Sequence, residues 1–269
     1  MKEITLTEDI KMLSYPFDGS GNIFGFTTTR HGGVSGGSYA SLNLGAFAGD
    51  DAGNVAENRN RLCRSIGIDS RWLFLPHQVH GSDLLYIDDA FLTLPEARQQ
   101  ELLDGKDAVI TTVKNSCVGV TTADCVPVLL YCPQKGVVAA IHAGWKGTVS
   151  RIASSCVKYM QEQLQVVPEN LYAVIGPSIS VECFEVGEEV VERFREARYP
   201  DAVFRLNPHT GKTHIDLWQA NRLDLEQSGL LPSRIAVAGI CTRTHSSDFF
   251  SARKLGIASG RMVSGIFMR

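Results

Sequence analysis

Three short segments of this sequence contain residues that could bind a metal ion. His80 in "HQVHG", Cys125 in "TADC" and His142 in "HAGW" each end a predicted strand, beside a glycine or an acidic turn residue. Two imidazoles and one thiolate form a borderline-soft ligand set that suits Zn²⁺, and three protein ligands leave a fourth position for water, as in catalytic zinc sites. The segments are 45 and 17 residues apart and match no short zinc motif. From spacing alone, a buried cysteine and two hydrogen-bonded histidines are the simpler interpretation.

The composition limits the class of protein and its partners. The chain has 269 residues, of which 44% are hydrophobic and 20% charged, enough for a sizeable core in one domain or in two halves. The net charge is −3 without a basic stripe, so we expect no nucleic acid partner. The apolar runs are too short to span a bilayer, and the N-terminal segment lacks a secretory apolar stretch. Seven irregularly spaced cysteines argue against a disulfide framework, so we expect a cytoplasmic protein without a membrane partner.

Strand-like segments outnumber helical ones and come in groups, which favours an α+β fold with mixed sheets over a doubly wound parallel sheet. The predicted helices cover 50–67, 145–165, 186–197 and 216–229. The predicted strands cover 22–30, 72–81, 106–112, 116–122, 127–132, 136–143, 170–177, 234–240 and 260–268, with a hairpin over 204–217. A Gly- and Ser-rich loop over 31–45 is either flexible or shaped around a ligand.

Several of these segments occur together, in this order, in one known family. They are "TTTRHGGVSGGSYASLNLG", "VAENRNRL", "QVHG", "TADC", "HAGWKG", "IGPSIS" with "CFEVGEEV", and "FFSARK". The chain resembles the YlmD/YfiH family, whose members are variously named laccase-domain proteins, polyphenol oxidases, peptidoglycan editing factors and purine nucleoside phosphorylases. The resemblance covers roughly residues 20 to 269. It implies an α+β fold: a single four-layer α/β/β/α domain with mixed sheets, of the YfiH type, over residues 1–269.

The resemblance also implies metal ligands and a purine nucleoside activity. The histidine of QVHG, the cysteine of TADC and the histidine of HAGW correspond to His80, Cys125 and His142, and the family implies Zn²⁺ there. His77 lies outside the QVHG motif and is expected to be a pocket wall or a surface residue. The implied reactions are phosphorolysis of adenosine, inosine, guanosine or methylthioadenosine, with phosphate as the second substrate, and hydrolytic deamination of adenosine.

Deamination needs an activated water and a carboxylate that carries protons. A zinc ion activates water near neutral pH for attack on C6 of the purine. Asp124, beside Cys125, is the nearest candidate for the catalytic proton carrier. Adjacent residues of a regular strand point to opposite faces, so Asp124 can serve only if TADC turns or bulges, which Pro127 favours. The alternative is that Asp124 caps a turn or accepts backbone N–H groups.

Phosphorolysis needs a site for a phosphate dianion, and arginines bind phosphate through two parallel hydrogen bonds. The candidate substrate-binding residues in the family motifs are Arg30, Asn43, Arg59, Gln78 and Arg253. The arginines are assigned to phosphate and the two amide side chains to the base or ribose. Each arginine has an alternative role as a solvated charge or in a structural ion pair. Family members usually carry FFSYRR, where this chain has Ala252 and Lys254, so no role is assigned to those two side chains.

Two further functions remain open from the sequence. The first is a copper-dependent, laccase-like polyphenol oxidase, because two histidines and a cysteine also bind Cu²⁺. A multicopper cluster needs more clustered histidines than this chain has, and no His-x-His pair is present. The second is a metal-free hydrolase acting in cell-wall editing, with Cys125 as the catalytic nucleophile and His142 as its base.

Other polar clusters carry weaker signals. "CTRTHSSDFF" contains His245 and Asp248, which could form a Cys-His-Asp triad with Cys241. Nothing in the spacing selects this triad over an ordinary polar loop. His209 and His214 lie on the predicted hairpin and are expected to face solvent rather than bind metal.

Overall fold

The computed structural model describes residues 2–6, 9–17 and 22–269. The strands are β1 Lys2–Thr5, β2 Lys11–Tyr15, β3 Ile23–Thr28, β4 Leu73–Phe74, β5 Leu84–Ile87, β6 Ala108–Thr111, β7 Cys117–Thr122, β8 Val126–Cys132, β9 Val137–Ala143, β10 Tyr172–Ile175, β11 Phe204–Leu206, β12 Thr213–Ile215, β13 Ile235–Val237 and β14 Met262–Met268. The α-helices are α1 Ala52–Ile66, α2 Asp89–Leu92, α3 Glu96–Leu103, α4 Trp145–Val149, α5 Ile152–Leu164, α6 Glu188–Glu196, α7 Leu217–Gln227 and α8 Ala252–Leu255.

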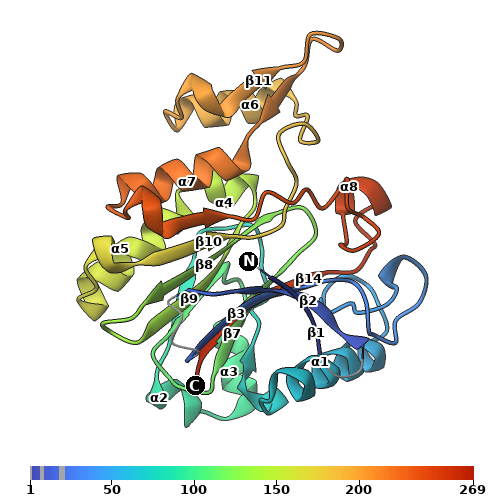
Figure 1. The fold of residues 1–269 in the computed structure, drawn as a ribbon, viewed down its shortest axis with the longest axis vertical. Coiled ribbons are helices and arrows are strands. Elements are labelled where there is room, and N and C mark those ends of the chain that lie inside the picture. Colours follow the sequence, from blue (N-terminus) through green and yellow to red (C-terminus); the bar gives the residue numbers. More distant parts are fainter. Residues whose placement is uncertain (1, 7–8, 18–21) are drawn as a thin grey trace.

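Two six-stranded sheets form the centre of the fold (Figure 1). The first has the strand order β1-β2-β3-β14-β7-β4, and the second has the order β13-β10-β8-β9-β6-β5. Both sheets are mixed, because the pairs β4–β7, β5–β6 and β10–β13 are parallel and the other pairs are antiparallel. The hairpin β11–β12 lies with α6 at one end of the molecule (Figure 1). The predicted α+β fold with mixed sheets is confirmed.

Three hydrophobic clusters of the described residues fill the spaces between the layers. Between the two sheets, Val118 of β7 and Leu129 of β8 belong to one cluster. On the outer face of the second sheet, α5 and α7 cover side chains such as Ile141 of β9. On the outer face of the first sheet, Leu62 of α1 shares a cluster with Val263 of β14. The order of layers is therefore helix, sheet, sheet, helix, because alternate side chains of each central strand face opposite clusters.

Two predicted elements differ in the structure. The segment 145–165 was expected to be one helix, but it forms α4 and α5, because Arg151 between them has a left-handed φ of 59°. The Arg151 guanidinium donates to the buried carboxylate of Asp224 on α7 and to the carbonyl oxygen of Ala197, contacts that offset the cost of this backbone conformation. The segment 72–81 is strand only at β4, and the remainder is a loop. The elements β1, β2, β5, α2, α3 and α8 were not predicted.

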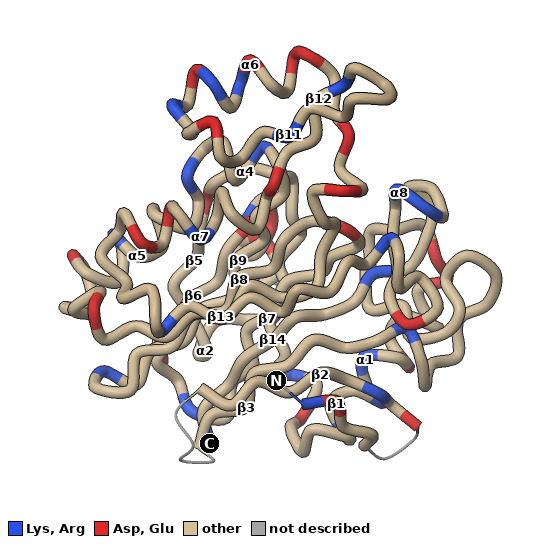
Figure 2. Tube along the Cα trace, turned by 45° about the horizontal axis from the view of Figure 1, so that its top comes forward, with Lys and Arg blue, Asp and Glu red and all other residues tan. Residues whose placement is uncertain are grey.

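Charged side chains of both signs are distributed along the chain (Figure 2). Pairs such as Arg61 and Glu57, one turn apart on α1, support the helix. In the part of the chain that the structure describes, no helix is both long enough and apolar enough to span a membrane.

Candidate functional site

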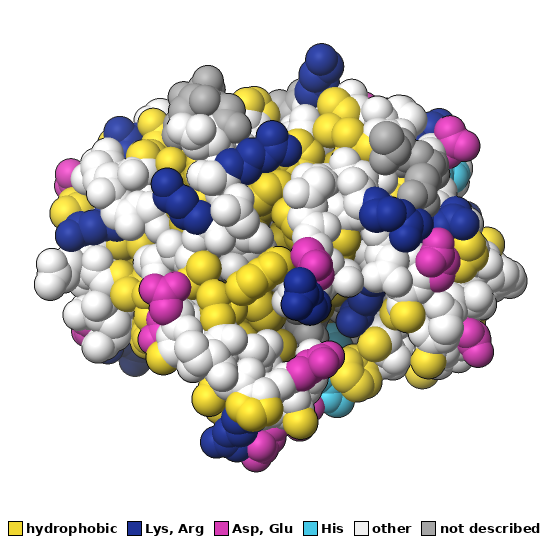
Figure 3. All heavy atoms as spheres, turned by 90° about the horizontal axis from the view of Figure 1, so that it is seen from below, with side chains coloured by type: hydrophobic (Ala, Val, Ile, Leu, Met, Phe, Trp, Pro, Cys, Tyr) yellow, Lys and Arg dark blue, Asp and Glu magenta, His cyan; other side chains and the backbone are white. Residues whose placement is uncertain are grey.

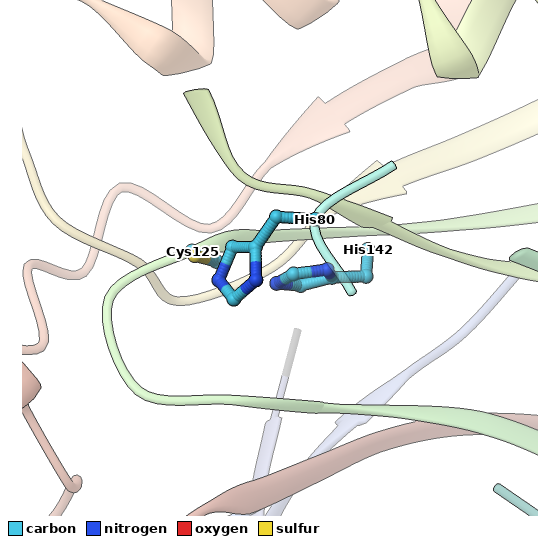
Figure 4. A group of neighbouring side chains, drawn as sticks. All are labelled: His80, Cys125 and His142. Atoms are coloured by element: carbon cyan, nitrogen blue, oxygen red, sulfur yellow. The ribbon is translucent and has the colours of Figure 1, made fainter. Parts of the chain in front are cut away.

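The side chains of His80, Cys125 and His142 come together beside the second sheet (Figure 4). Their ligand atoms, one from each residue, all lie within 4.8 Å of one another. The two imidazole rings are nearly perpendicular, at 78°, and their centroids are 4.8 Å apart. Zinc ligands lie about 2.0–2.3 Å from the ion, so small movements that bring these three donors closer together would let them bind one cation.

The hairpin of β8 and β9 brings Cys125 beside His142. In its antiparallel register, Val126 lies opposite Ala143. Cys125 directly precedes β8, so it lies opposite the point where β9 ends and the chain passes through Gly144 into α4. The spacing of 17 residues between the two candidate ligands is therefore the length of one hairpin.

Gly144 leaves room for the three candidate ligands. A Cβ atom at this position would lie 3.0 Å from Sγ of Cys125, 3.2 Å from Cδ2 of His80 and 3.6 Å from Cε1 of His142. The first two distances are shorter than ordinary contacts between carbon or sulfur atoms. A side chain at 144 would therefore push against Cys125 and His80 and lie in ordinary contact with His142.

Asp107 is a buried carboxylate that joins the two histidine segments, and it was not predicted from the sequence. It directly precedes β6, and its carbonyl oxygen accepts the N–H of His142 on the neighbouring strand β9. Its carboxylate lies 2.7 Å from Nδ1 of His142 and also accepts the backbone N–H groups of Val79, His80 and Gly81. The one sequence signal for it is an aspartate immediately before a strand whose residues are all buried.

The charges of the site stabilise one another. Burial opposes ionisation of the Cys125 thiol, but the charge of His142 and hydrogen bonds from His142 and His80 outweigh it, so the Cys125 pKa falls to about 6. Burial also favours a neutral His142 ring, but the Cys125 thiolate and the Asp107 carboxylate raise the His142 pKa to about 9. Burial alone would raise the pKa of Asp107, but hydrogen bonds from His142 and from backbone N–H groups outweigh it. The pKa of Asp107 is therefore below its ordinary value. Cys125 is thus a thiolate near neutral pH, the form that binds metals.

The three residues line a cavity of about 520 Å³, a volume typical of small-molecule sites. Its other side chains include the aromatic residues Phe47, Trp145 and Phe184 and the arginines Arg59, Arg253 and Arg261. Histidine atoms are visible in a hollow bordered by basic and hydrophobic side chains in the space-filling view (Figure 3). Asp124 is the one acidic residue among the described residues of the lining. The excess of positive charge suits a ligand with an anionic group.

Comparison with known proteins agrees with the motifs and the fold. A family model described as "Multi-copper polyphenol oxidoreductase laccase" matches residues 24–269. The chain belongs to this family. It is similar to a protein of Bacteroides thetaiotaomicron named purine nucleoside phosphorylase, with 44% identity over 98% of this chain and 99% of that protein. It is also 44% identical to a protein of an unknown prokaryotic organism named adenosine deaminase RL5, over 91% of this chain and 93% of that protein.

Solved structures of two relatives confirm the fold. The crystal structure of Bacillus licheniformis YfiH superposes with a TM-score of 0.89 and 28% identity, covering 99% of each chain. The structure of YlmD from Geobacillus stearothermophilus superposes with a TM-score of 0.86 and 33% identity, covering 94% of this chain and 93% of that chain. The resemblance to the YlmD/YfiH family inferred from the sequence is therefore confirmed.

Arg30 does not reach the cavity. Its Nε–H and Nη1–H groups donate to the carbonyl oxygens of Ala40 and Ser246, and its guanidinium lies over the ring of Phe250. Arg30 is not among the described residues of the cavity lining. The donors of Arg30 hold two loops together, and its assignment to substrate stays a prediction.

The two amide side chains predicted to bind the base or ribose also make internal hydrogen bonds. Asn43 is fully buried, lies outside the described lining of the cavity, and accepts the N–H groups of Gly45 and Arg261 through Oδ1. Asn43 thus positions the backbone of Arg261, and its assignment to substrate stays a prediction. Gln78 does line the cavity, but its amide both donates to and accepts from the backbone of Thr121 on β7.

Arg59 and Arg253 line the cavity, and so does Arg261, which was not predicted. Arg59 comes from α1, and its Nε–H donates to the carbonyl oxygen of Leu44. Burial lowers the pKa of the Arg59 guanidinium, and no ion pair of the described residues includes it. The Arg253 guanidinium lies over the ring of Phe184, with 5.3 Å between its Cζ and the ring centroid. The Nη1–H of Arg253 donates to the carbonyl oxygen of Glu185, so Arg59 and Arg253 each keep other N–H donors that can bind an added anion.

The TADC segment turns at Asp124, which is the geometry that the predicted catalytic role of Asp124 needs. The φ of Asp124 is 92°, and the residue lies in a bend between β7 and β8. Its Oδ1 accepts the hydroxyl of Thr242 at 2.6 Å, and its Oδ2 accepts the N–H of Arg253 at 2.7 Å. These are also the contacts expected if Asp124 caps a turn. Each oxygen can accept a second hydrogen bond, so the two roles are compatible.

His77 is a wall of the cavity, as expected for a histidine outside the QVHG motif. Its Nδ1 lies 2.6 Å from the carboxylate of Asp104, which fixes the ring. The ring of Phe47 stacks on it, with 3.7 Å between centroids and 26° between planes. The pair forms a flat aromatic face at the rim of the cavity, where Phe47 is 68% exposed.

The remaining polar clusters do not form catalytic arrangements. The Nδ1–H of His245 donates to the carbonyl oxygen of Cys241, not to its sulfur, and the carboxylate of Asp248 pairs with His31. The Cys-His-Asp triad considered from the sequence is therefore not formed. His214 is buried, so the expectation that it faces solvent is wrong.

Proposed function

We propose that this chain is a zinc-dependent enzyme of purine nucleosides, which catalyses phosphorolysis of adenosine, inosine, guanosine or methylthioadenosine and hydrolytic deamination of adenosine. The observation that carries the proposal is the group formed by His80, Cys125 and His142, with ligand atoms within 4.8 Å of one another in a cavity that also contains three arginines. The names of two relatives, each 44% identical to this chain, support the substrate class.

The residues of the site fit zinc on several grounds. The donor set contains two imidazole nitrogens and a sulfur whose pKa of about 6 favours the thiolate. Asp107 hydrogen-bonds to the second nitrogen of His142, an arrangement usual for metal-bound histidines. Gly144 leaves the space between the ligands free of a side chain. When bound, zinc supplies Lewis-acid activation of water for hydrolysis at neutral pH.

In deamination, we assign proton transfer to Asp124. Its carboxylate lines the cavity next to Cys125 and is held in place by Thr242 and by the backbone N–H of Arg253. It takes a proton from the attacking water and returns it to the departing amino group as ammonia leaves C6. The aromatic side chains Phe184 and Trp145 also line this cavity and offer apolar surface to a purine base.

In phosphorolysis, we assign binding of the phosphate dianion to Arg59, with Arg253 and Arg261 contributing positive charge. Each of these side chains lines the cavity. Burial makes the charge–charge attraction in this cavity stronger than in water. An oxygen of the phosphate then bonds to the ribose carbon that carries the base while the glycosidic C–N bond breaks, and the purine leaves with the proton that the phosphate gives up. The positive charge that develops on the sugar is stabilised by the bound anion.

Replacing Arg59 with glutamine is expected to weaken phosphorolysis much more than deamination. A hydrogen bond to a charged group contributes about 1.5–3 kcal/mol, so the KM for phosphate should rise by roughly 10- to 100-fold. Deamination of adenosine consumes water and no phosphate, and its rate should change by less than about threefold. The two rates are measured in the same preparation. The exposed Arg71, replaced in the same way, serves as the control and should change neither.

Metal analysis combined with chelation tests the proposal as a whole. We expect about one zinc per chain, release of inosine from adenosine, loss of this activity with a chelator, and recovery on adding Zn²⁺. Oxidation of phenols that requires added copper, without turnover of nucleosides, would instead support the copper oxidase named in the family description. Full activity in chelator, with loss only on replacing Cys125, would support a thiolate nucleophile.

A further inference from the structure

We infer that Asp107 is the positioning residue that assembles the metal site, because one carboxylate fixes both the backbone that carries His80 and the ring of His142. The inference rests on the proposed function, since it concerns the same three ligands. It assigns to Asp107 no contact with substrate. The argument depends on hydrogen bonds and backbone geometry of the described residues.

The carboxylate of Asp107 uses its full capacity on these two segments. Its Oδ1 lies 3.0 Å from the backbone nitrogen of His80 and 2.7 Å from Nδ1 of His142. Its Oδ2 lies 3.2 Å from the nitrogen of Val79 and 2.7 Å from that of Gly81. An ionised carboxylate has about four lone-pair sites, and four donors occupy them here. The side chain has no exposed surface, so water does not compete for these sites.

His80 depends on this carboxylate for its backbone conformation. Its φ is 61°, in the left-handed region that residues other than glycine rarely adopt, and it belongs to a loop rather than a strand. Three consecutive N–H groups, of Val79, His80 and Gly81, converge on Asp107, which is the geometry of a backbone anion site. Without the anion, these three donors would lose their common acceptor, and the loop would lose the conformation that turns the His80 ring toward Cys125 and His142 (Figure 4).

The same carboxylate decides which ring nitrogen of His142 is available to a metal. An ionised carboxylate can only accept, so Nδ1 of His142 carries the proton and donates to Asp107. A metal that binds this ring therefore displaces the proton on Nε2 and takes the lone pair of that nitrogen. The backbone N–H of His142 also donates to the carbonyl oxygen of Asp107 at 2.8 Å, so ring and backbone are tied to one residue. Asp107 therefore sets the position of one ligand and the tautomer of another.

A second carboxylate–histidine pair in the chain provides a matched control. Nδ1 of His77 lies 2.6 Å from the carboxylate of Asp104, nearly the same distance as in the pair of His142 and Asp107. The Asp104 side chain is 67% exposed, and none of the described backbone N–H groups donates to its carboxylate. His77 is not one of the three candidate ligands. Replacing Asp104 with asparagine thus changes a similar carboxylate–histidine pair to an amide–histidine pair without disturbing the proposed ligands.

The test compares the zinc affinities of Asp107→Asn and Asp104→Asn with that of the unmodified chain. The asparagine amide nearly matches aspartate in shape, but its NH₂ group donates and cannot accept. Whichever carboxylate oxygen it replaces, two of the four hydrogen bonds to Asp107 are lost. We expect Asp107→Asn to bind Zn²⁺ about 10- to 100-fold more weakly, and Asp104→Asn to stay within about twofold. Affinity is measured by competition with a chromophoric chelator, and thermal unfolding reports on the fold. Deamination by Asp107→Asn should recover as Zn²⁺ is raised, which a purely structural defect would not allow.

Nuclear magnetic resonance of the zinc-loaded, ¹⁵N-labelled chain tests the same inference without a variant. It therefore still tests the role of Asp107 if Asp107→Asn does not fold. We expect a protected proton on Nδ1 of His142 and the metal-shifted resonance on Nε2. A metal on Nδ1, or a folded Asp107→Asn chain with unchanged zinc affinity, would overturn the inference and leave the proposed function standing. Failure of the unmodified chain to bind Zn²⁺ would overturn the proposed function itself.

Discussion

Replacement of Cys125 by alanine is expected to remove the metal and both nucleoside activities together while leaving the fold intact. Binding of zinc to protein ligands contributes about 10–16 kcal/mol in total, so loss of one of three ligands costs roughly 3 kcal/mol or more. That corresponds to at least about 100-fold in affinity. The half-buried thiol directly precedes β8 and takes no part in its ladder, so the free energy of unfolding should change little. Metal content after dialysis and release of inosine from adenosine are the two measurements.

Cys183 provides the control for this experiment. It is also half-buried and lies outside the described lining of the cavity, so Cys183→Ala should keep its metal and its activity. His80→Ala and His142→Ala should behave like Cys125→Ala. Retention of zinc by any two of these three ligand variants would show that the metal, if present, binds elsewhere.

Two of the three candidate ligands could be placed from the sequence because the elements that carry them are local. The runs 127–132 and 136–143 are apolar and separated by turn residues, which predicts a hairpin, and a hairpin fixes Cys125 and His142 opposite each other. Burial of these strands on both faces explains why their apolar pattern is continuous rather than alternating.

His80 could be named from its motif but could not be placed, because its position depends on a residue 27 positions further along the chain. The predicted strand over 72–81 follows local propensity, and the structure departs from it where three N–H groups bind Asp107. A carboxylate that binds backbone leaves no periodic signal in the sequence. The break at Arg151 has the same kind of cause, since its partner Asp224 lies on α7.

The sequence also could not show which arginines face the cavity. A guanidinium has five N–H donors, and these can form hydrogen bonds either to phosphate or to backbone carbonyl groups. Arg30 and Arg261 both donate to carbonyl groups, yet only Arg261 is among the described residues that line the cavity. Residue type and motif therefore predict that arginines surround the site, whereas tertiary structure decides which of them face the ligand.

Replacement of Gly144 by alanine is expected to reduce zinc affinity by about 100-fold with little effect on folding. The φ of −61° and ψ of 170° at Gly144 are open to alanine, so the backbone itself is not strained. The new Cβ would lie 3.0 Å from Sγ of Cys125 and 3.2 Å from Cδ2 of His80, so both side chains must move away by several tenths of an ångström. Added atoms in a packed site cost about 1–3 kcal/mol, and metal bonds tolerate deviations of only about 0.2 Å.

Gly36→Ala separates this effect from the general effect of adding a methyl group. Gly36 also has a negative φ, −112°, and a Cβ there would meet nothing within 4 Å. The two variants should unfold within a few degrees of each other, while only Gly144→Ala should require a large excess of Zn²⁺ to restore deamination. Equal zinc affinity in the two variants would mean that the three ligands bind the ion without approaching residue 144. In that case zinc binding would not require a glycine at this position.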